Sequence, residues 1–279
     1  MLSSLSSVFE TLSYFIFKNL NTSQLMASAE STIWSAFKRP IDISTYGHLS
    51  DWLFDYITIA ITISFIIVCV GLFGFCYYYS EKRNKIPYYT YGYKKAHLKV
   101  TLFIGLAVFF GIDAMIAGIS NHDLQSTFWN FPKEEEKPLK IEILAQQWMW
   151  NFRYAGVDEE FNTDDDITTN HLLYMPKGRK IEFRLTSKDV IHSFYIPFIR
   201  NKVDTIPGRI TRLWVELTKT GEYDIACAEM CGTHHYKMKA KAIILENEEF
   251  EQWLSSANKL AKDGVDPATI ENYWGWKWK

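Results

Sequence analysis

The sequence has little net charge, few cysteines and no internal repeats. Its 279 residues carry a formal net charge of -2, which excludes a polycation that binds nucleic acid through the phosphate backbone. Apolar residues make up 48% of the chain, too many for a disordered protein. None of its cysteines belongs to a C-x-x-C-H motif, so this sequence has no c-type haem attachment site. Its high aromatic content, 16%, points instead towards a membrane.

Two long apolar segments make the membrane signal specific. Residues 57–79 contain no charged side chain, and residues 100–120 contain one, Asp113. Each segment reaches the roughly 20 apolar residues that cross a bilayer. Each is therefore predicted to be a transmembrane helix rather than the buried helix of a soluble protein.

The segment between the two spans is basic and predicts their orientation. Short positive loops stay on the cytoplasmic side of a membrane, so both ends of the chain are predicted to lie outside. One acid, Glu81, stands against the basic residues Lys82, Arg83, Lys85, Lys94, Lys95 and Lys99.

The N-terminal residues 1–50 are predicted to be an extension on the outer face. Residues 27–29, Ala-Ser-Ala, resemble a signal-peptide cleavage site. The apolar stretch before them is short, however, and residues 1–9 contain no base, so an uncleaved extension is favoured.

Beyond residue 121 the chain changes character. A polar, proline-bounded linker leads into short β-like runs separated by turn residues, which predict an antiparallel sandwich or barrel. A final helix is predicted with Asn247 as its N-cap and Gly264 as its stop. The predicted parts are the extension 1–50, the hairpin 51–121, the linker 122–138, the β domain 139–246, and the C-terminal helix and tail 247–279.

Residues 227–238, "CAEMCGTHHYKM", place two thiols, two imidazoles and a thioether in one short loop. A disulfide between Cys227 and Cys231 would suit an oxidising compartment but leaves the histidines unexplained. A structural zinc site accepts cysteine and histidine, but it has little use for the thioether of Met238. Copper accepts all three ligand types in electron-transfer sites, and two cysteines with this spacing could bridge two metals.

The same residues carry a resemblance. The pattern C-x-E-x-C-x-x-x-H-x-x-M resembles the dinuclear copper (CuA) loop of subunit II of the cytochrome c oxidases of the haem-copper family. "SKDVIHSFYIP" at 187–197 and "VDTIPGR" at 203–209 resemble two further segments of that subunit, and "QWMWNF" at 147–152 resembles its aromatic motif. The hairpin followed by an outer β domain is also that family's layout.

The resemblance implies a role for each matching residue. Cys227 and Cys231 would bridge two coppers, and His192 and His235 would each bind one. The remaining implied ligands are Met238 and the carbonyl of Glu229, both weak, and the Glu229 side chain would bind magnesium at the interface with subunit I. Met230 and His234 are expected to be structural.

Two tryptophans of the "QWMW" motif are assigned different roles. Trp148 and Trp150 are two residues apart on a predicted strand and so share a face, which is also the pattern of ordinary core aromatics. The resemblance makes Trp148 the residue through which electrons enter, and Trp150 is expected to pack.

The implied fold is a two-helix transmembrane hairpin followed by an all-β cupredoxin-like domain with a C-terminal helix. The implied function is that of an oxidoreductase subunit, which accepts electrons from a c-type cytochrome and passes them to haem in subunit I. Oxygen is reduced to water there, coupled to proton pumping. Expected partners are subunits I and III and the lipid bilayer, with no nucleic acid. The expected location is a bacterial plasma membrane or a mitochondrial inner membrane, with the copper domain outside.

The chain departs from the family pattern in two places. The family's glutamate near the inner end of the second span is missing, and Asp113 does not replace it, because it lies nearer the outer surface and is expected to face a partner subunit.

Arg153 and Lys188 stand where the family often has acids that attract cytochrome c. The acidic segment 158–166 is either a relocated attraction site or a solvated loop.

Three other protein classes share part of this pattern. Subunit II of a quinol oxidase has the same layout but lacks the copper ligands. The copper domain of nitrous oxide reductase shares the loop, but those chains are longer and lack the hairpin. A membrane-anchored copper or zinc protein without redox partners would leave "QWMW" and "VDTIPGR" unexplained.

Overall fold

The computed structural model describes residues 38–264 apart from residues 84, 85, 87, 88, 90, 157 and 164, with the backbone alone for residues 259–264. The expectations for residues 1–37, for the tail 265–279 and for Lys85 and Asp164 lie outside the described residues. By its internal contacts the chain divides after Ile41, and the helices and strands described below belong to the second unit, Asp42–Lys279.

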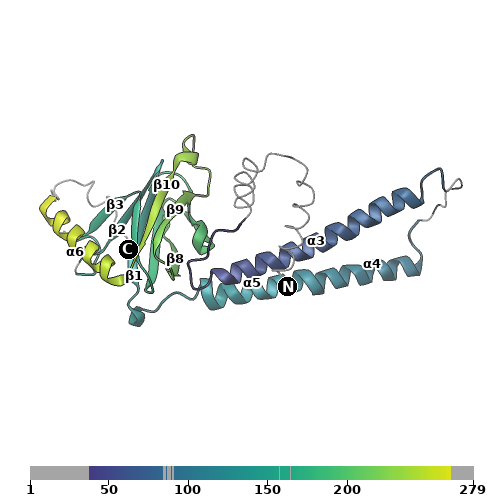
Figure 1. Ribbon diagram of the computed structural model, residues 1–279, viewed down its shortest axis with the longest axis horizontal. Helices are drawn as coiled ribbons and strands as arrows, with labels where there is room; N and C mark the ends of the chain where they lie inside the picture. The colour runs from purple at the N-terminus through teal and green to yellow at the C-terminus, as the bar shows by residue number, and fades with distance from the viewer. Residues whose placement is uncertain are drawn as a thin grey trace, which may run out of the picture. The chain divides into compact units, whose positions relative to one another are not determined.

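Two long apolar helices lie where the two spans were predicted, and each is long and apolar enough to cross a membrane (Figure 1). The first, α3, runs over Gly47–Tyr78. The second, Lys95–Phe128, consists of α4 (Lys95–Val108), the π-helical η1 (Phe109–Asp113), α5 (Ala114–Asp123) and the π-helical η2 (Leu124–Phe128). Both helices extend beyond the uncharged runs, because a helix does not end where its hydrophobic face ends. The predicted linker therefore begins inside a helix, which continues to Phe128.

The two helices are held together where η1 interrupts the regular α-helix. The hydroxyl of Tyr56 donates a hydrogen bond of 2.7 Å to the carbonyl of Gly111, which lies within this π-helical turn. Tyr56 directly precedes the charge-free run 57–79. Asp113 is two residues beyond Gly111, so it lies near the level of Tyr56, at the N-terminal end of the charge-free run of α3.

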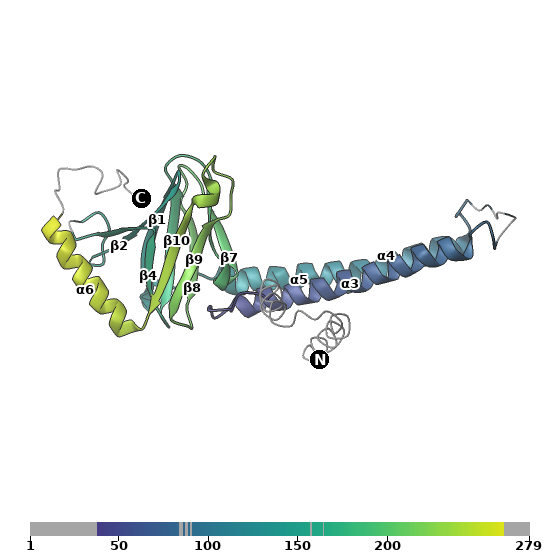
Figure 2. The same cartoon turned by 45° about the horizontal axis from the view of Figure 1, so that its top comes forward.

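The outer domain is a sandwich of two five-stranded sheets, as predicted (Figures 1 and 2). One sheet has the strand order β3-β2-β1-β5-β8 and the other β4-β10-β9-β6-β7. The strands are β1 (Leu139–Gln146), β2 (Met149–Tyr154), β3 (Ile167–Asn170), β4 (Leu172–Pro176), β5 (Lys180–Ser187), β6 (His192–Ile196), β7 (Asn201–Thr205), β8 (Thr211–Glu216), β9 (Gly221–Cys227) and β10 (Lys239–Leu245). Short 3-10 turns are η3 (Glu134–Glu136), η4 (Pro197–Ile199) and η5 (His235–Lys237).

The expectation of a wholly antiparallel sandwich is wrong at two pairings. β1 pairs with β5 in parallel, and so does β10 with β4. Strands β3 and β7 were not predicted. Period-two alternation reports which face of a sheet a residue occupies, but not which strand lies beside it, so the sequence pattern could not identify these neighbours.

The core lies between the two sheets and is built from alternating apolar positions. Phe152 on β2, Phe183 on β5 and Phe194 on β6 are fully buried, and Phe194 packs edge-on or tilted against the other two rings. Helix α6 (Asn247–Gly264) has the predicted bounds. Its Trp253 stacks on Tyr174 of β4 with ring centroids 4.3 Å apart, which holds the helix to the sandwich.

A buried ion pair crosses the outer face of the first sheet. Arg153 on β2 lies directly opposite Glu142 on β1, and the guanidinium donates two hydrogen bonds to that carboxylate. Both side chains are buried. Arg153 also lies 3.3 Å from the carboxylate of Asp166 and bonds the side chain of Asn162. It therefore ties the acidic segment to the sheet and is not a surface charge.

Replacing Arg153 by alanine is expected to destabilise the domain by about 3–5 kcal/mol, because it leaves the Glu142 carboxylate buried without its main partner. Denaturant unfolding of the detergent-solubilised chain, followed by near-ultraviolet circular dichroism, measures the change. The matched control is Lys177→Ala, which removes the exposed pair with Glu246 and is expected to change stability far less. Equal effects of the two substitutions would contradict a structural role for the buried pair.

Candidate metal centre

The loop between β9 and β10 lies at one end of the sandwich (Figures 1 and 2). Cys227 is the last residue of β9, and the chain returns in β10 at Lys239. The neighbouring strand β6 begins with His192 and pairs with β9 through Phe194 and Cys227. Strand register therefore brings His192 to a loop that is distant in the sequence.

The structure brings the six predicted copper ligands together. The sulfur atoms of Cys227 and Cys231 are 3.8 Å apart. The Nδ1 atom of His192 lies 3.9 Å from the Cys227 sulfur, and Nδ1 of His235 lies 3.4 Å from the Cys231 sulfur. The remaining predicted ligands are the Met238 sulfur, 3.8 Å from Cys231 Sγ and 3.1 Å from His192 Nδ1, and the Glu229 carbonyl, 3.2 Å from Cys227 Sγ.

The donor set fits a thiophilic metal. Both cysteines are free, and their sulfur separation far exceeds the roughly 2.05 Å of a disulfide bond. His192, Cys227 and Cys231 are buried, with ligand atoms within 4.8 Å of one another. Two thiols, two imidazole nitrogens and a thioether in a dry pocket suit copper better than the hard cations, which prefer oxygen.

The two thiols differ in acidity. Burial raises the pKa of Cys227, but hydrogen bonds from His192 and from the backbone outweigh it and lower the pKa to about 6. Burial and the adjacent charge of Cys227 raise the pKa of Cys231 to about 12. One thiolate therefore forms readily, and the second requires a cation between the sulfurs.

Asp189 sets the orientation of the His192 ring. Its carboxylate lies 2.9 Å from Nε2 of His192, so the bonded Nε2 carries the hydrogen and Nδ1 is left facing the sulfurs. The same carboxylate accepts hydrogen bonds from the backbone of Gln147 and Val190. Partial burial raises the pKa of Asp189. The hydrogen bonds from His192, Gln147 and Val190 outweigh this effect and hold the pKa below its usual value.

The "QWMW" turn is hydrogen-bonded to the cysteine loop. Trp148 donates from Nε1 to the carbonyl of Cys231 at 3.2 Å, and its ring lies 4.6 Å from that of His234. Gln147 donates to the same carbonyl at 2.8 Å. The role of Gln147 was missed by the sequence analysis, and its only signal is its place beside Trp148. Trp150 is fully buried against His192 and Phe194.

The exposed side chains of the loop do not belong to the five residues whose side chains are predicted copper ligands. Met230 is 73% exposed, and the side chains of Glu229 and His234 are also exposed. Among the described residues, the Glu229 carboxylate does not form a metal-binding group of three with other His, Cys, Asp or Glu side chains.

The acidic segment 158–166 lies away from this centre. Trp148 precedes β2, whereas the segment follows Tyr154 at the opposite end of that strand, roughly 17–20 Å away at 3.3 Å per residue. Asp165 is buried, and Asp166 turns inward to Arg153. These positions favour a loop packed on its own domain over a docking site beside the copper ligands.

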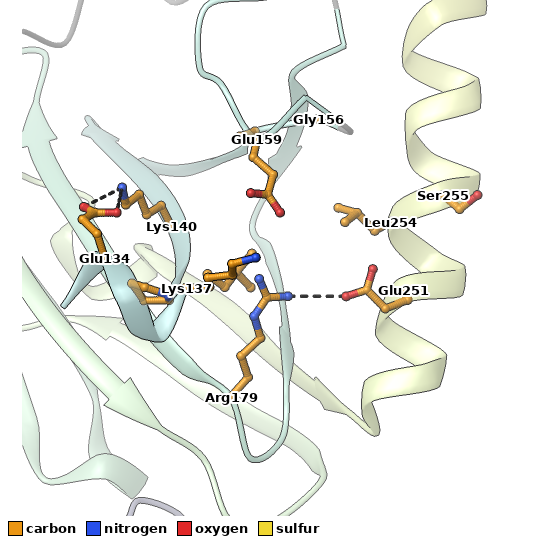
Figure 3. Close-up of a pocket in the computed structure, with 12 residues that line it drawn as sticks. Glu134, Lys137, Lys140, Gly156, Glu159, Arg179, Glu251, Leu254 and Ser255 are labelled. Carbon is orange, nitrogen blue, oxygen red and sulfur yellow. Dashed lines mark hydrogen bonds and ion pairs between the residues drawn. The ribbon is translucent and has the colours of Figure 1, made fainter. Parts of the chain in front are cut away.

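A pocket of about 500 Å³ lies at that same far end (Figure 3). Its lining includes Leu254 and Ser255 of α6, and the ion pair between Arg179 and Glu251 crosses it. Both basic and acidic side chains line it, and Lys140 is paired with Glu134. None of the predicted site residues lines this pocket.

The β domain is similar in sequence to known proteins. Residues 139–246 match the family described as the periplasmic domain of cytochrome c oxidase subunit II. The alternative cytochrome c oxidase subunit 2 of Bradyrhizobium diazoefficiens is 29% identical over 248 residues, covering 78% of this chain and 83% of that protein. The probable cytochrome c oxidase subunit 2 of Rickettsia conorii is 29% identical over 226 residues, covering 76% and 69%. A crystal structure of the periplasmic domain of subunit II of cytochrome oxidase from Bradyrhizobium japonicum is 28% identical and covers 43% of this chain and 94% of that chain, with a TM-score of 0.39.

Replacing Asp189 by asparagine is expected to weaken copper binding about 10- to 100-fold, because a neutral amide is a weaker acceptor for Nε2 of His192 than a carboxylate and can turn its NH2 group towards the ring instead. Competition with a copper chelator measures the affinity. Glu222→Gln on β9, which alters an exposed pair with Lys241, is the control and should leave it unchanged. An unaltered affinity in the Asp189 variant would remove this residue from the account of the site.

Proposed function

We propose that this chain is the electron-accepting subunit of a cytochrome c oxidase, because its residues 139–246 match the periplasmic domain of subunit II of that enzyme. It takes electrons from a c-type cytochrome and passes them to haem in subunit I. Oxygen is reduced to water there, and protons are pumped. The observation that carries the proposal is the pair of free, buried thiols 3.8 Å apart, with an imidazole nitrogen beside each sulfur.

We assign the ligands of a dinuclear copper centre to the residues that the fold brings together. Cys227, Cys231, His192 and His235 would hold the two metals through their sulfur and imidazole nitrogen atoms. Met238 and the carbonyl of Glu229 would be the weak ligands. A bound pair of coppers supplies storage of one electron shared over two metals.

The chain's own residues prepare this pocket before any metal arrives. Burial of His192, Cys227, Cys231 and Met238 keeps water out. Asp189 holds the imidazole, while Trp148 and Gln147 hold the Cys231 carbonyl. A site with ligands fixed in advance changes little in geometry when its charge changes, which favours fast electron transfer.

The partners and the membrane complete the proposal. The hairpin anchors the chain beside subunits I and III, with the basic segment between the spans inside and the copper domain outside. The membrane is a bacterial plasma membrane or a mitochondrial inner membrane. The exposed carboxylate of Glu229 is assigned to a magnesium ion shared with subunit I, because magnesium prefers oxygen ligands.

Replacing either Cys227 or Cys231 by serine is expected to lower the bound copper from two ions per chain to fewer than one, because the remaining thiol cannot bridge two metals. Elemental analysis of the purified full-length chain gives the ratio. Cys76→Ser, which alters an exposed thiol of α3, should retain full copper. Two coppers per chain in both loop variants would overturn the ligand assignment and favour adventitious metal binding.

Replacing Trp148 by phenylalanine is expected to slow reduction by a c-type cytochrome several-fold while leaving the copper content unchanged. The indole ring lies against the cysteine loop, and phenylalanine removes its bond to the Cys231 carbonyl. Stopped-flow absorbance follows the reduction. Trp129→Phe, at an exposed tryptophan beyond the second helix, is the control. Equal rates in the two variants would assign Trp148 a purely structural role.

A further inference from the structure

The two helices of the hairpin meet the outer domain at Trp214 of β8. Tyr46 directly precedes α3, and Phe128 is the last residue of the second helix. The ring of Tyr46 packs edge-on against those of Phe128 and Trp214, at centroid distances of 5.1 and 5.2 Å. The Tyr46 hydroxyl donates to the carbonyl of Trp214 at 2.6 Å, and Trp214 donates from Nε1 to the carbonyl of Thr127 at 2.9 Å. Trp214 is therefore joined to the roots of both helices.

The chain before α3 is bound to the sandwich as well. Ile43 donates its backbone N–H to the carbonyl of Phe198, and its own carbonyl accepts a hydrogen bond from Thr218. Ser44 forms a β-bridge with Leu217, just beyond the end of β8. The side chain of Ile43 is fully buried in the core. The first helix thus leaves the domain from a fixed point and not from a free tether.

One point of attachment would still allow the domain to turn on the hairpin, and a second contact lies further along α3. Asp51 is five residues beyond Tyr46, which is about 7.5 Å at 1.5 Å per residue. There Arg200, in the turn between β6 and β7, donates to the Asp51 carboxylate from Nε at 2.8 Å and from Nη2 at 3.2 Å. Two separate contacts fix an orientation that one contact would leave free.

The side chain of Arg200 is held in place for this ion pair. Arg200 is 12% exposed and Asp51 25%, so solvent and salt screen the pair less than an exposed one. The Nη1 atom of Arg200 donates to the carbonyl of Pro197 at 3.0 Å. The backbone of Arg200 is in the left-handed region, with φ at 60°, which glycine adopts more readily than a residue with a side chain. An arginine at such a position indicates a role for its guanidinium.

The same strand carries a predicted copper ligand at its other end. Strand β6 runs from His192 to Ile196, and the turn with Arg200 follows it. At 3.3 Å per residue, the strand places His192 roughly 13 Å from Ile196. Because β6 is hydrogen-bonded to both β7 and β9, a fixed turn at one end fixes the metal pocket at the other.

Resting on the proposed function, we propose that Arg200 and Asp51 are positioning residues, which set the orientation of the copper domain on the membrane hairpin. Tyr46 and Trp214 form the pivot, and the ion pair prevents rotation about it. Electron transfer slows steeply as two centres move apart, so this orientation determines how fast the copper pair can reduce the haem of subunit I. The chain itself sets the orientation before subunit I binds.

The first test measures the orientation in the metal-free full-length chain in lipid nanodiscs. Spin labels are attached through p-acetylphenylalanine, which does not react with thiols, in place of Phe65 on α3 and Asp224 on β9, two exposed side chains. Pulsed electron paramagnetic resonance then gives the distribution of distances between the labels. The parent chain is expected to give one narrow distribution. Arg200→Asp is expected to broaden it, because two carboxylates then repel each other at the contact.

An exchange of the two charges provides the matched rescue. The double variant Arg200→Asp/Asp51→Arg restores an ion pair of opposite polarity and is expected to restore the narrow distribution. Arg179→Asp, which reverses a pair with Glu251 inside the outer domain, should leave the distribution unchanged. A distribution that stays narrow in Arg200→Asp would overturn the positioning role. So would a double variant as broad as the single one.

The second test measures the consequence for electron transfer in the copper-loaded chain assembled with subunit I. After rapid reduction of the copper centre, the absorbance of the haem follows the onward transfer. Arg200→Asp is expected to slow this step several-fold, with the copper spectrum and the rate of reduction by the cytochrome unchanged. The charge-exchanged double variant is expected to recover the wild-type rate.

The outcomes separate this inference from the function on which it rests. An unchanged rate of onward transfer in a variant with broadened distances would mean that subunit I sets the orientation, and it would overturn the positioning role alone. A wild-type complex in which the copper centre never reduces the haem would overturn the proposed function. The distances measured in the metal-free chain would still decide whether the ion pair fixes the domain.

Discussion

Two buried sulfur atoms 3.8 Å apart are the constraint on which the rest of this domain depends. Two thiolates at that distance repel each other, and the acidities of Cys227 and Cys231 reflect this. The pKa of Cys227 is lowered to about 6, and the pKa of Cys231 is raised to about 12. A cation between the two sulfurs would remove this repulsion. The ligands of the metal-free pocket are therefore already arranged to bind a metal. The bonds of Trp148 and Gln147 to the Cys231 carbonyl keep the second sulfur in place while it is still protonated.

The sandwich separates this centre from the domain's other interactions. Turns at one end carry the ligands. The buried pair of Arg153 with Glu142, the acidic segment and helix α6 stabilise the domain elsewhere. Because β6 runs from His192 to the turn that contacts α3 through Arg200, one strand joins the ligand end of the domain to the membrane anchor.

Much of the site was predictable because most of its ligands lie in one contiguous loop. Their spacing along the chain is the same whichever way the strands pair. His192 was assigned through a resemblance, since only the pairing of β6 with β9 brings it to the cysteines. The hairpin and α6 were readable from hydrophobic runs and capping residues. The parallel pairings of β1 with β5 and of β4 with β10 were not, because alternation does not encode strand neighbours. Nor could the sequence show that Arg153 is buried and paired with Glu142.

The proposed function requires that one electron be shared by two coppers in this loop. Electron paramagnetic resonance of the copper-loaded full-length chain tests it most directly. The expected spectrum shows hyperfine structure from an unpaired electron divided equally between two copper nuclei. A spectrum typical of a single isolated copper ion would contradict it, since the two thiols would then not bridge a metal pair.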